Sequence, residues 1–442
     1  MTEARAMIGV RMVVGAILLC ASAWCAGSPS IQRWVTDDVP VLFVAAPEIP
    51  MFKVRVVFAA GSARDHAAPG LAALTNALLG EGTAALTTDE FHRQLENTGA
   101  QLGSGTTRDM AFLSLKSLTD RRVAQPAVAL LNGALVAPRF DAADFARARQ
   151  QMLAGLEQEK SSPAALGDRA MHRAIYGKHP YALPRSGTEA SVAAFSLDAV
   201  RAFHRQYYVR RNALVVIVGA LSRAEAETLA AQVVAGLPAG ARAPALPPVP
   251  PLTEEHTERV AFPGAQSHLI FAQPGISRHD PDYFPLVVGN HVLGANGSVA
   301  LLFQEIREKR GLSYAVDSYF EPMAEAGPFV VSLQTDHRRE REARAVLFDT
   351  LRRFIEDGPE EAALAAARQN LIGGFPLRID SNSKLAEYLT IIGFYDLPLD
   401  YLEAYPRAVA AVTAAQVRDA FQRRVRLDQM AKITVGPPAP SP

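Results

Sequence analysis

Two kinds of hydrophobic pattern alternate along the chain. The run at 214–218 is apolar throughout and that at 54–59 is apolar except for Arg55, and both are typical of buried strands. The longer segments 141–159 and 196–206 repeat apolar residues with the period of an amphipathic helix. The pattern therefore predicts a fold in which strands and helices are mixed.

The second half of the chain repeats a sequence pattern of the first. The run VVFA at 56–59 is followed by NALLG at 76–80, and LIFA at 269–272 is followed by NHVLG at 290–294, with a spacing that differs by one residue. Matched order and spacing favour a duplicated unit. We expect an α+β protein of two homologous domains, each a mostly antiparallel or mixed sheet packed with helices. Two such domains would form a clamshell that suits an extended ligand between them.

The amino terminus has the features of a secretory signal peptide. Arg5 and Arg11 precede an apolar run at 12–19, which is followed by small residues. A transmembrane helix needs roughly 20 apolar residues, so this run is too short for one. We expect an exported protein, periplasmic or otherwise extracytoplasmic, with no membrane insertion after signal cleavage. Both cysteines, Cys20 and Cys25, lie in or beside this segment, so the mature protein has no internal disulfide.

A proline-rich stretch, PAGARAPALPPVPP, begins at Pro238 and separates the two halves. Proline favours extended, semi-rigid backbone, as in a linker between domains. The predicted organisation is a signal peptide at 1–27, an N-terminal domain at 28–237, a linker at 238–252 and a C-terminal domain at 253–437.

Composition and motifs exclude several classes of function. The 442 residues hold 45 Lys and Arg against 45 Asp and Glu, so no excess positive charge drives nucleic-acid binding. The phosphate-binding loop, the dinucleotide fingerprint and the hydrolase elbow are all missing from the sequence. Ser381 to Lys384 fit S-x-x-K, but without its K-T-G partner motif this segment is expected to be a helix-starting turn.

The ten histidines form no pair with the i,i+4 spacing of a helical zinc site. His179 is expected in a structural turn. Asp317, Asp336 and His337 follow strand residues, where loop or capping roles are expected and substrate contact is the alternative.

One segment resembles a catalytic motif that has lost its functional side chains. The sequence GLAALTNALLGEGT at 70–83 resembles the segment of pitrilysin/insulinase-type zinc metallopeptidases, the inverzincins, that carries H-x-x-E-H. The resemblance places Ala73 and Ala77 at the two histidine ligands and Asn76 at the general base. The family's third zinc ligand, a glutamate, falls on Gly155. The resemblance thus implies a degenerate zinc site and no metal or other cofactor in this chain.

A second segment resembles the family's C-terminal domain more closely. The sequence LFQEIREKRGLSYAV at 302–316 contains an arginine and a tyrosine seven residues apart, Arg307 and Tyr314, which act on substrate in the family. We expect a helix that opens near Ser298 and ends at Gly311, so that the two side chains converge. Such fixed donors hold a substrate carbonyl and stabilise charge on its oxygen. An ordinary helix-end arginine and strand tyrosine is the alternative.

The combined pattern is similar to the non-catalytic subunit in the mitochondrial-processing-peptidase-like branch of the family. The resemblance implies a substrate-binding subunit, inactive alone, that supplies Arg307 and Tyr314 to a homologous H-x-x-E-H subunit, which holds the zinc and cleaves a peptide. A peptide-binding or scaffolding pseudopeptidase with no catalytic role is the alternative. A stand-alone hydrolase with an unrecognised site is the third hypothesis.

Overall fold

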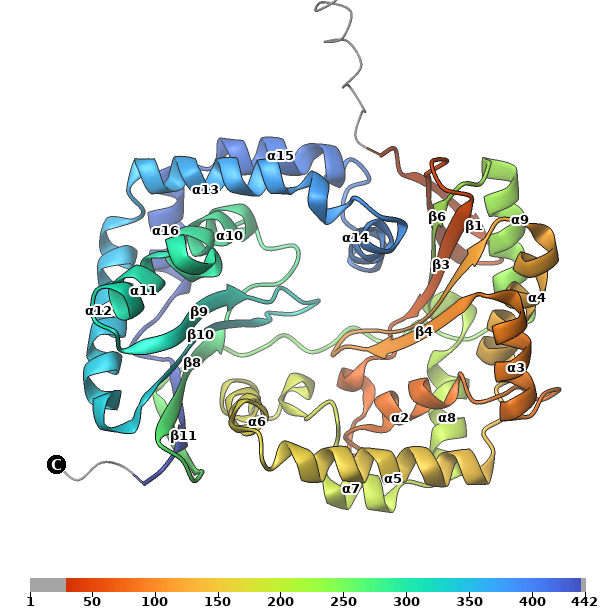
Figure 1. The fold of residues 1–442 in the computed structure, drawn as a ribbon, viewed down its shortest axis with the longest axis horizontal. Helices are drawn as coiled ribbons and strands as arrows, with labels where there is room; N and C mark the ends of the chain where they lie inside the picture. The colour runs from red at the N-terminus through yellow and green to blue at the C-terminus, as the bar shows by residue number, and fades with distance from the viewer. Residues whose placement is uncertain (1–28, 439–442) are drawn as a thin grey trace, which may run out of the picture.

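The computed structural model describes residues 29–438, which fold into two β-sheets flanked by helices (Figure 1). The signal peptide expected at 1–27 lies outside the described residues. The first sheet has the order β1-β2-β6-β3-β5-β4, with strands β1 (Gln32–Thr36), β2 (Val39–Ala45), β3 (Met51–Phe58), β4 (Gln101–Thr106), β5 (Ala111–Leu118) and β6 (Ala213–Gly219). The second sheet has the order β7-β11-β8-β10-β9, with strands β7 (His256–Ala261), β8 (Gln266–Pro274), β9 (Ser313–Phe320), β10 (Pro328–Asp336) and β11 (Ala431–Gly436).

The two sheets share one topology. Without the edge strand β1, the first sheet reads β2-β6-β3-β5-β4 and matches the second strand by strand. In each sheet the outer pair is parallel, β2 with β6 and β7 with β11, while the remaining neighbours are antiparallel. This correspondence confirms the predicted duplication and the mixed sheets.

The helices follow the same order in both halves. In the first half they are α2 (Leu71–Leu78), α3 (Thr88–Thr98), α4 (Arg121–Val136), α5 (Ala142–Glu159), α6 (Pro163–Tyr176), α7 (Glu189–Ala194), α8 (Leu197–Tyr207) and α9 (Arg223–Val234). In the second half they are α10 (Tyr283–Asn290), α11 (Leu301–Phe303), α12 (Glu340–Asp357), α13 (Glu361–Gly374), α14 (Asn382–Phe394), α15 (Tyr401–Ala411) and α16 (Ala414–Arg424). The predicted helices 141–159 and 196–206 agree with α5 and α8 to within one residue. None of the helices in residues 29–438 combines the length and the hydropathy that crossing a membrane requires.

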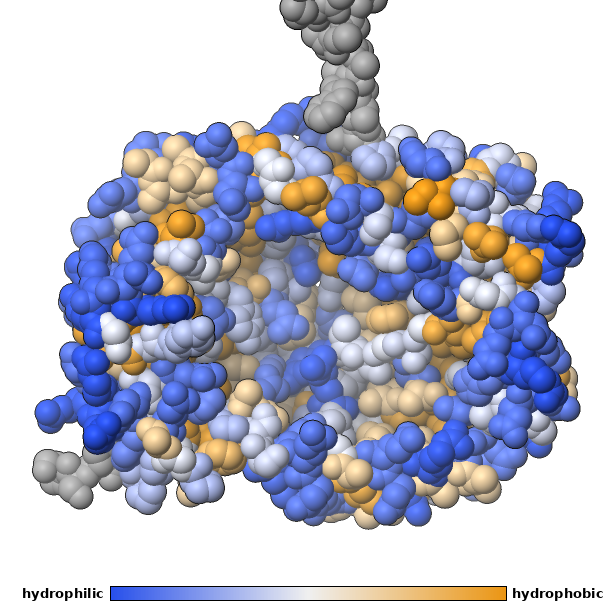
Figure 2. All heavy atoms as spheres, in the orientation of Figure 1, coloured by the Kyte–Doolittle hydropathy of each residue, from blue (hydrophilic) through white to orange (hydrophobic). Residues whose placement is uncertain are grey.

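The two halves exchange one helix each. Helix α6 of the first half packs on β8 and β11 of the second sheet, and α14 of the second half packs on β3 and β6 of the first. A glycine allows each close approach, because a Cβ on Gly167 would lie 2.4 Å from Ile270 and a Cβ on Gly393 would lie 2.8 Å from Leu214. The exchange surrounds a hollow that opens between the lobes, with hydrophilic residues at its floor (Figure 2).

The buried cores therefore cross the predicted domain boundary. Leu385 and Leu389 of α14 belong to one apolar cluster with Val216 of β6. Met171 of α6 belongs to another with Ile433 of β11. Burial of such side chains contributes about 1.5–3 kcal/mol each, so the halves stabilise one another.

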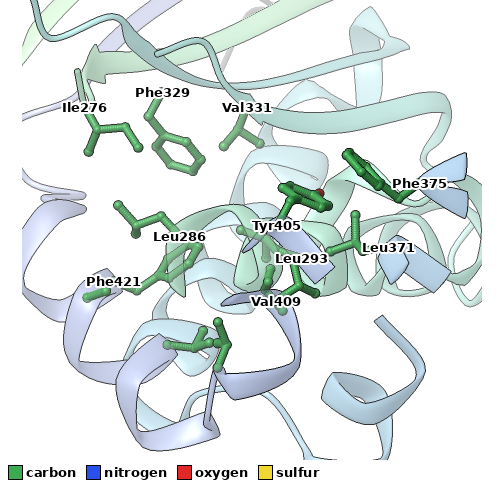
Figure 3. Packing of buried hydrophobic residues seen from close by; sticks show 14 of the residues in the cluster. Ile276, Leu286, Leu293, Phe329, Val331, Leu371, Phe375, Tyr405, Val409 and Phe421 are labelled. Carbon is green, nitrogen blue, oxygen red and sulfur yellow. The ribbon is translucent and has the colours of Figure 1, made fainter. Parts of the chain in front are cut away.

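The second half has a core of its own between its sheet and its outer helices. Figure 3 shows Phe329 of β10 facing Leu286 of α10 and Phe421 of α16, and the rings of Phe375 and Tyr405 lie together. The last two stack with their centroids 4.5 Å apart. This packing fixes α10 and the segments that follow it against the sheet.

The proline-rich segment joins α9 to β7, and residues 237–255 form neither helix nor strand. The segment is held in place by contacts with the first half. The Pro247 carbonyl accepts a 2.8 Å hydrogen bond from His179 Nε2, and the Ala243 amide donates to Asn212 Oδ1 at 3.1 Å. His179 also caps the turn Pro180–Ala182 by accepting from the Tyr181 amide, which is the structural role expected for it. The boundaries at 237 and 253 remain predictions, since α6 and α14 pack across them.

Candidate functional site

The degenerate zinc positions lie on α2 and α5, two helices that pack together. Helix α2 begins after Gly70, and the buried Asp65 carboxylate accepts from the Gly70 and Ala72 amides at 2.7 Å each. Burial raises the pKa of Asp65 to about 7. On this helix Ala73 is half-buried and Ala77 is exposed, so both present only methyl groups.

Asn76, at the general-base position, is engaged in structural hydrogen bonds. Its buried Nδ2 donates to the Phe112 carbonyl at 3.2 Å and to the Tyr208 hydroxyl at 3.3 Å. Burial raises the pKa of Tyr208, which is consistent with a neutral acceptor. The amide therefore ties α2 to β5 and to the end of α8, and an amide does not act as a base at neutral pH.

The third ligand position offers no donor either. Gly155 is exposed on α5, and nothing lies within 4 Å of the position a Cβ would take. The nearby Glu157 pairs with Lys160 at 2.7 Å, and Glu159 pairs with Arg169 at 2.9 Å.

Two methyl groups, an amide and a glycine do not fit zinc, whose ligands in proteins are thiolates, imidazoles and carboxylates. No group of three or more His, Cys, Asp or Glu side chains in residues 29–438 is arranged to hold a metal ion.

The structure brings Arg307 and Tyr314 together at the start of β9. The Arg307 guanidinium carbon lies 4.4 Å from the centroid of the Tyr314 ring and 4.7 Å from that of Phe303, so the cation sits between two rings. Its Nη1 donates to the Tyr314 carbonyl at 3.1 Å. The Tyr314 side chain is 78% exposed. Cation–π contact and hydrogen bonding hold the pair in one geometry at the surface.

The segment that carries Arg307 differs from the expected single helix. Residues Gly297–Val299 form a 3-10 turn, and α11 begins only after Ala300, so the predicted N-cap at Ser298 is wrong. The chain then widens into a π-helical turn, Gln304–Glu308 (η6), in which the Lys309 amide donates to the Gln304 carbonyl. The expected left-handed end at Gly311 is present, with φ at 57°. Single π-helical turns occur frequently at functional sites.

A buried carboxylate, that of Glu305, stabilises this turn. Glu305 is 7% exposed and accepts from Lys309 Nζ at 2.6 Å and from Arg310 Nη1 at 2.8 Å. The hydrogen bond from Lys309, followed by that from Arg310, lowers the pKa of Glu305 despite its burial. The neighbouring cations are thus engaged with Glu305, while Arg307 is directed toward Tyr314.

Strand β9 also borders a cavity of about 340 Å³ between α6 and the second sheet. Residues of α6, β8, β9 and β10 line it, among them Asp168, His268, Ala315, Asp317, Tyr319 and Ser332. Ser332 Oγ donates to Asp317 Oδ1 at 2.6 Å, and burial raises the pKa of Tyr319 to about 12. Since β9 is the last strand of its sheet, its free edge is a place where an extended peptide can add.

Asp317 lies within β9, so the loop or capping role expected for it is wrong. The other sequence candidates have separate roles. Asp336 accepts from the Arg338 amide and caps a short turn, and His337 Nδ1 lies 3.2 Å from Ser267 Oγ. Sequence reasoning missed Asp168, His268 and Tyr319, which meet only because α6 packs on the sheet of the other half. A local pattern contains no signal for that contact.

Comparisons with known proteins agree with this geometry. Residues 41–189 match the family model "Insulinase (Peptidase family M16)", and residues 194–371 match "Peptidase M16 inactive domain". A solved M16 inactive domain from Pseudomonas fluorescens is 38% identical, with a TM-score of 0.90, over 93% of this chain and 99% of that one. A non-peptidase homolog from Helicobacter pylori is 24% identical over 89% of this chain and 90% of its own length. An uncharacterized zinc protease from Bacillus subtilis is 23% identical over 80% and 86% respectively.

Proposed function

Because the chain belongs to the peptidase M16 family, we propose that it is the non-catalytic, substrate-binding subunit of a heterodimeric zinc metallopeptidase. In this proposal a homologous subunit with intact H-x-x-E-H holds the zinc and activates the attacking water. This chain binds the peptide and supplies Arg307 and Tyr314 to the partner's active site. We further propose that the complex works outside the cytoplasm, as the signal peptide predicts.

The observation that carries the proposal is the contrast between α2 and the start of β9. The zinc positions offer no ligand, while Arg307 lies between two rings 4.4 and 4.7 Å away and donates to the Tyr314 carbonyl. Preorganised donors of this kind stabilise charge on a substrate oxygen without further rearrangement. The 78% exposure of Tyr314 makes the pair accessible to a second chain.

The cavity and the free edge of β9 support peptide binding by the same region. Tyr314 and the cavity-lining Asp317 and Tyr319 all belong to β9. A peptide added along this edge would pass from the cavity toward the Arg307 and Tyr314 pair. The strand would supply main-chain hydrogen bonds, and the cavity would accept one side chain.

Co-expression with an H-x-x-E-H homologue tests the proposal. The complex should cleave peptides, and Arg307→Ala should lower its kcat by about 100- to 1,000-fold, the usual cost of one transition-state donor. Tyr314→Phe should lower kcat by a smaller factor, because the ring that contacts Arg307 stays. The matched control is Arg352→Ala on α12, where a half-exposed arginine pairs with Asp349 at 3.8 Å.

Other outcomes assign the alternatives. A stable complex with full activity in both variants would leave a peptide-binding or scaffolding pseudopeptidase. Cleavage by the purified chain alone, together with stoichiometric zinc in metal analysis, would favour the stand-alone hydrolase.

A further inference from the structure

A cluster of three cations lies on the inner face of the first sheet, beside the start of α14. We call Lys53, Arg55 and Lys116 the cationic cluster. Helices α4 and α9 cover the other face of this sheet, while Lys53 and Arg55 contact α14 on the side of the hollow. The register of β3 and β5 places Lys53 directly opposite Lys116. Two like charges at directly opposed positions destabilise a sheet, so the pair does not serve the stability of the fold.

Arg55 is the most buried member of the cluster. Its side chain is 9% exposed and lies over the Phe112 ring, with the guanidinium carbon 4.2 Å from the ring centroid. Nη1 donates to Thr390 Oγ1 at a long 3.4 Å. Within the described residues, Arg55 Nε is buried with no hydrogen-bond partner. A buried donor without a partner costs about 1–3 kcal/mol, more when it is charged.

The neighbouring carboxylates do not balance the cluster. Glu387 approaches Arg55 only to 3.9 Å and is 60% exposed. Burial, with the charges of Arg55 and Lys116, lowers the pKa of Lys53 against the opposing effect of Glu387. Asp380 is already paired with Lys384 at 3.0 Å.

The start of α14 adds to the positive potential. Ser383, in the first turn, has its Oγ 3.2 Å from Lys53 Nζ. Ser381 caps the helix by accepting from the Lys384 amide. The amino end of this 13-residue helix carries a partial positive charge from the aligned peptide dipoles.

The cluster is open toward the edge of the sheet. The edge strand β4 places Gln101 opposite Lys116 and glycine opposite both Ser114 and Phe112. Because Gly103 and Gly105 have no side chains, the side chain that β4 places beside the cluster on the inner face is that of the exposed Gln101. A ligand in the hollow can therefore reach Lys116 and Lys53 from that side.

We propose that the cationic cluster is a carboxylate-binding site in the hollow, which takes either the C-terminal carboxylate or an acidic side chain of a bound peptide. The inference rests on the proposed function in that the peptide is the ligand. A carboxylate between Lys53 and Lys116 relieves their repulsion and accepts charge-assisted hydrogen bonds. Asp168 of α6 and Asp317 of β9 line the cavity at the second sheet, so carboxylates lie there where the first sheet has cations, and this difference orients the peptide.

Peptide binding to the purified chain tests the site. Three N-acetylated peptides that share one sequence without other charged groups are compared by calorimetry: a free acid, its C-terminal amide, and the amide with one internal residue replaced by glutamate. At least one carboxylate-bearing peptide should bind about tenfold or more tightly than the neutral amide. Tighter binding of the free acid identifies a C-terminal carboxylate as the ligand, and tighter binding of the glutamate peptide identifies a side chain.

The variant Lys53→Gln/Lys116→Gln should abolish this preference. The matched control Lys160→Gln/Lys178→Gln removes the same charge elsewhere and should retain it. Equal affinity for all three peptides, or an equal loss in both double variants, would overturn the proposal. If the double variant does not fold, Lys116→Gln alone should reduce the preference severalfold, and an unchanged preference there would overturn it too.

A peptide-free measurement separates this site from the proposed function. Sodium acetate should raise Tm more than sodium chloride does at equal ionic strength, and the excess should vanish in Lys53→Gln/Lys116→Gln but not in the control. An acetate effect without peptide binding would reject the proposed function and keep the carboxylate site. Peptide binding without any carboxylate preference or acetate effect would reject the carboxylate site and leave the proposed function standing.

Discussion

The two halves of this protein have one topology and different surface chemistry. Both sheets follow the same strand order, and both are completed by a helix from the other half. In the first half, the helix after the central strand has Ala73, Asn76 and Ala77 at its chemically important positions. In the second half, α10 follows the central strand, and the chemistry lies further along the chain, where a π-helical turn fixes Arg307 against Tyr314.

The difference shows that, within one helix, the residues that pack in the core are not the residues that would take part in catalysis. Leu74 and Leu78 hold α2 in its core, and neither would be a ligand. Ala73 and Ala77 lie toward the surface, so the fold does not depend on what they offer a metal. A half can therefore keep its architecture while it lacks every catalytic side chain.

The largest loss of stability is expected at the exchanged helices, α6 and α14, where the two halves are most alike. Leu389→Ala in α14 and Met171→Ala in α6 each remove a buried side chain that packs on the other half. Each should lower the free energy of unfolding by about 2–5 kcal/mol. Urea denaturation followed by circular dichroism measures this loss.

The same denaturation decides whether the halves are interlocked. Because each helix belongs to the core of the other half, unfolding should remain a single transition in both variants. Two separated transitions in either variant would show that the halves fold independently. Val346→Ala on α12, a partly buried position within the second half, serves as the control.

A smaller loss of stability is expected at Asn76, which the family resemblance places at the general-base position. Asn76→Ala leaves the Phe112 carbonyl and the Tyr208 hydroxyl without the amide. The loss should be about 1–3 kcal/mol of unfolding free energy. The activity of the proposed heterodimer should not change, because Asn76 is expected to act in stability alone. Lost activity in a folded Asn76→Ala complex would show that α2 still takes part in chemistry.

The sequence predicts the duplication and the Arg307 and Tyr314 pair because both depend on contiguous residues. The strand–turn–helix order repeats with a similar spacing, and Arg307 and Tyr314 are only seven residues apart. The start of the helix at Ser298 was mispredicted because Gly297, at φ 53°, and a 3-10 turn precede it. A π-helical turn shifts backbone hydrogen bonds by one residue and has no side-chain pattern that identifies it.

The cavity and the cationic cluster could not be predicted from the chain alone. The amphipathic pattern of α6 shows that one face is buried but not which sheet buries it. Lys53 and Lys116 lie 63 positions apart in sequence and meet only through the register of β3 and β5. Long-range register and the exchange of helices are decided by the whole core.

The smallest effect on stability is expected from the titration of two buried histidines, one in each half. His204 is 6% exposed and donates from Nε2 to the Leu135 carbonyl at 2.9 Å, and His291 is 7% exposed with Nε2 3.0 Å from Asn370 Oδ1. Burial lowers the pKa of both below 6.5, the value for a free imidazole. At these two histidines the unfolded chain then binds more protons than the folded one just below pH 6.5.

The stability that these two histidines contribute should therefore be complete above pH 6.5 and fall as the pH drops below it, by at most about 1.4 kcal/mol per pH unit for each histidine, while Asp65, with its pKa raised to about 7, acts in the opposite direction. His204→Gln keeps a side-chain donor and removes one titrating group, and His291→Gln does so in the other half. Each variant should reduce the slope of the unfolding free energy against pH, measured by urea denaturation between pH 7.5 and 5.5. The double variant should reduce this slope further. If one variant flattens the slope and the other does not, acid sensitivity belongs to one half only, and the two halves differ in their buried polar groups as well as in their surface chemistry.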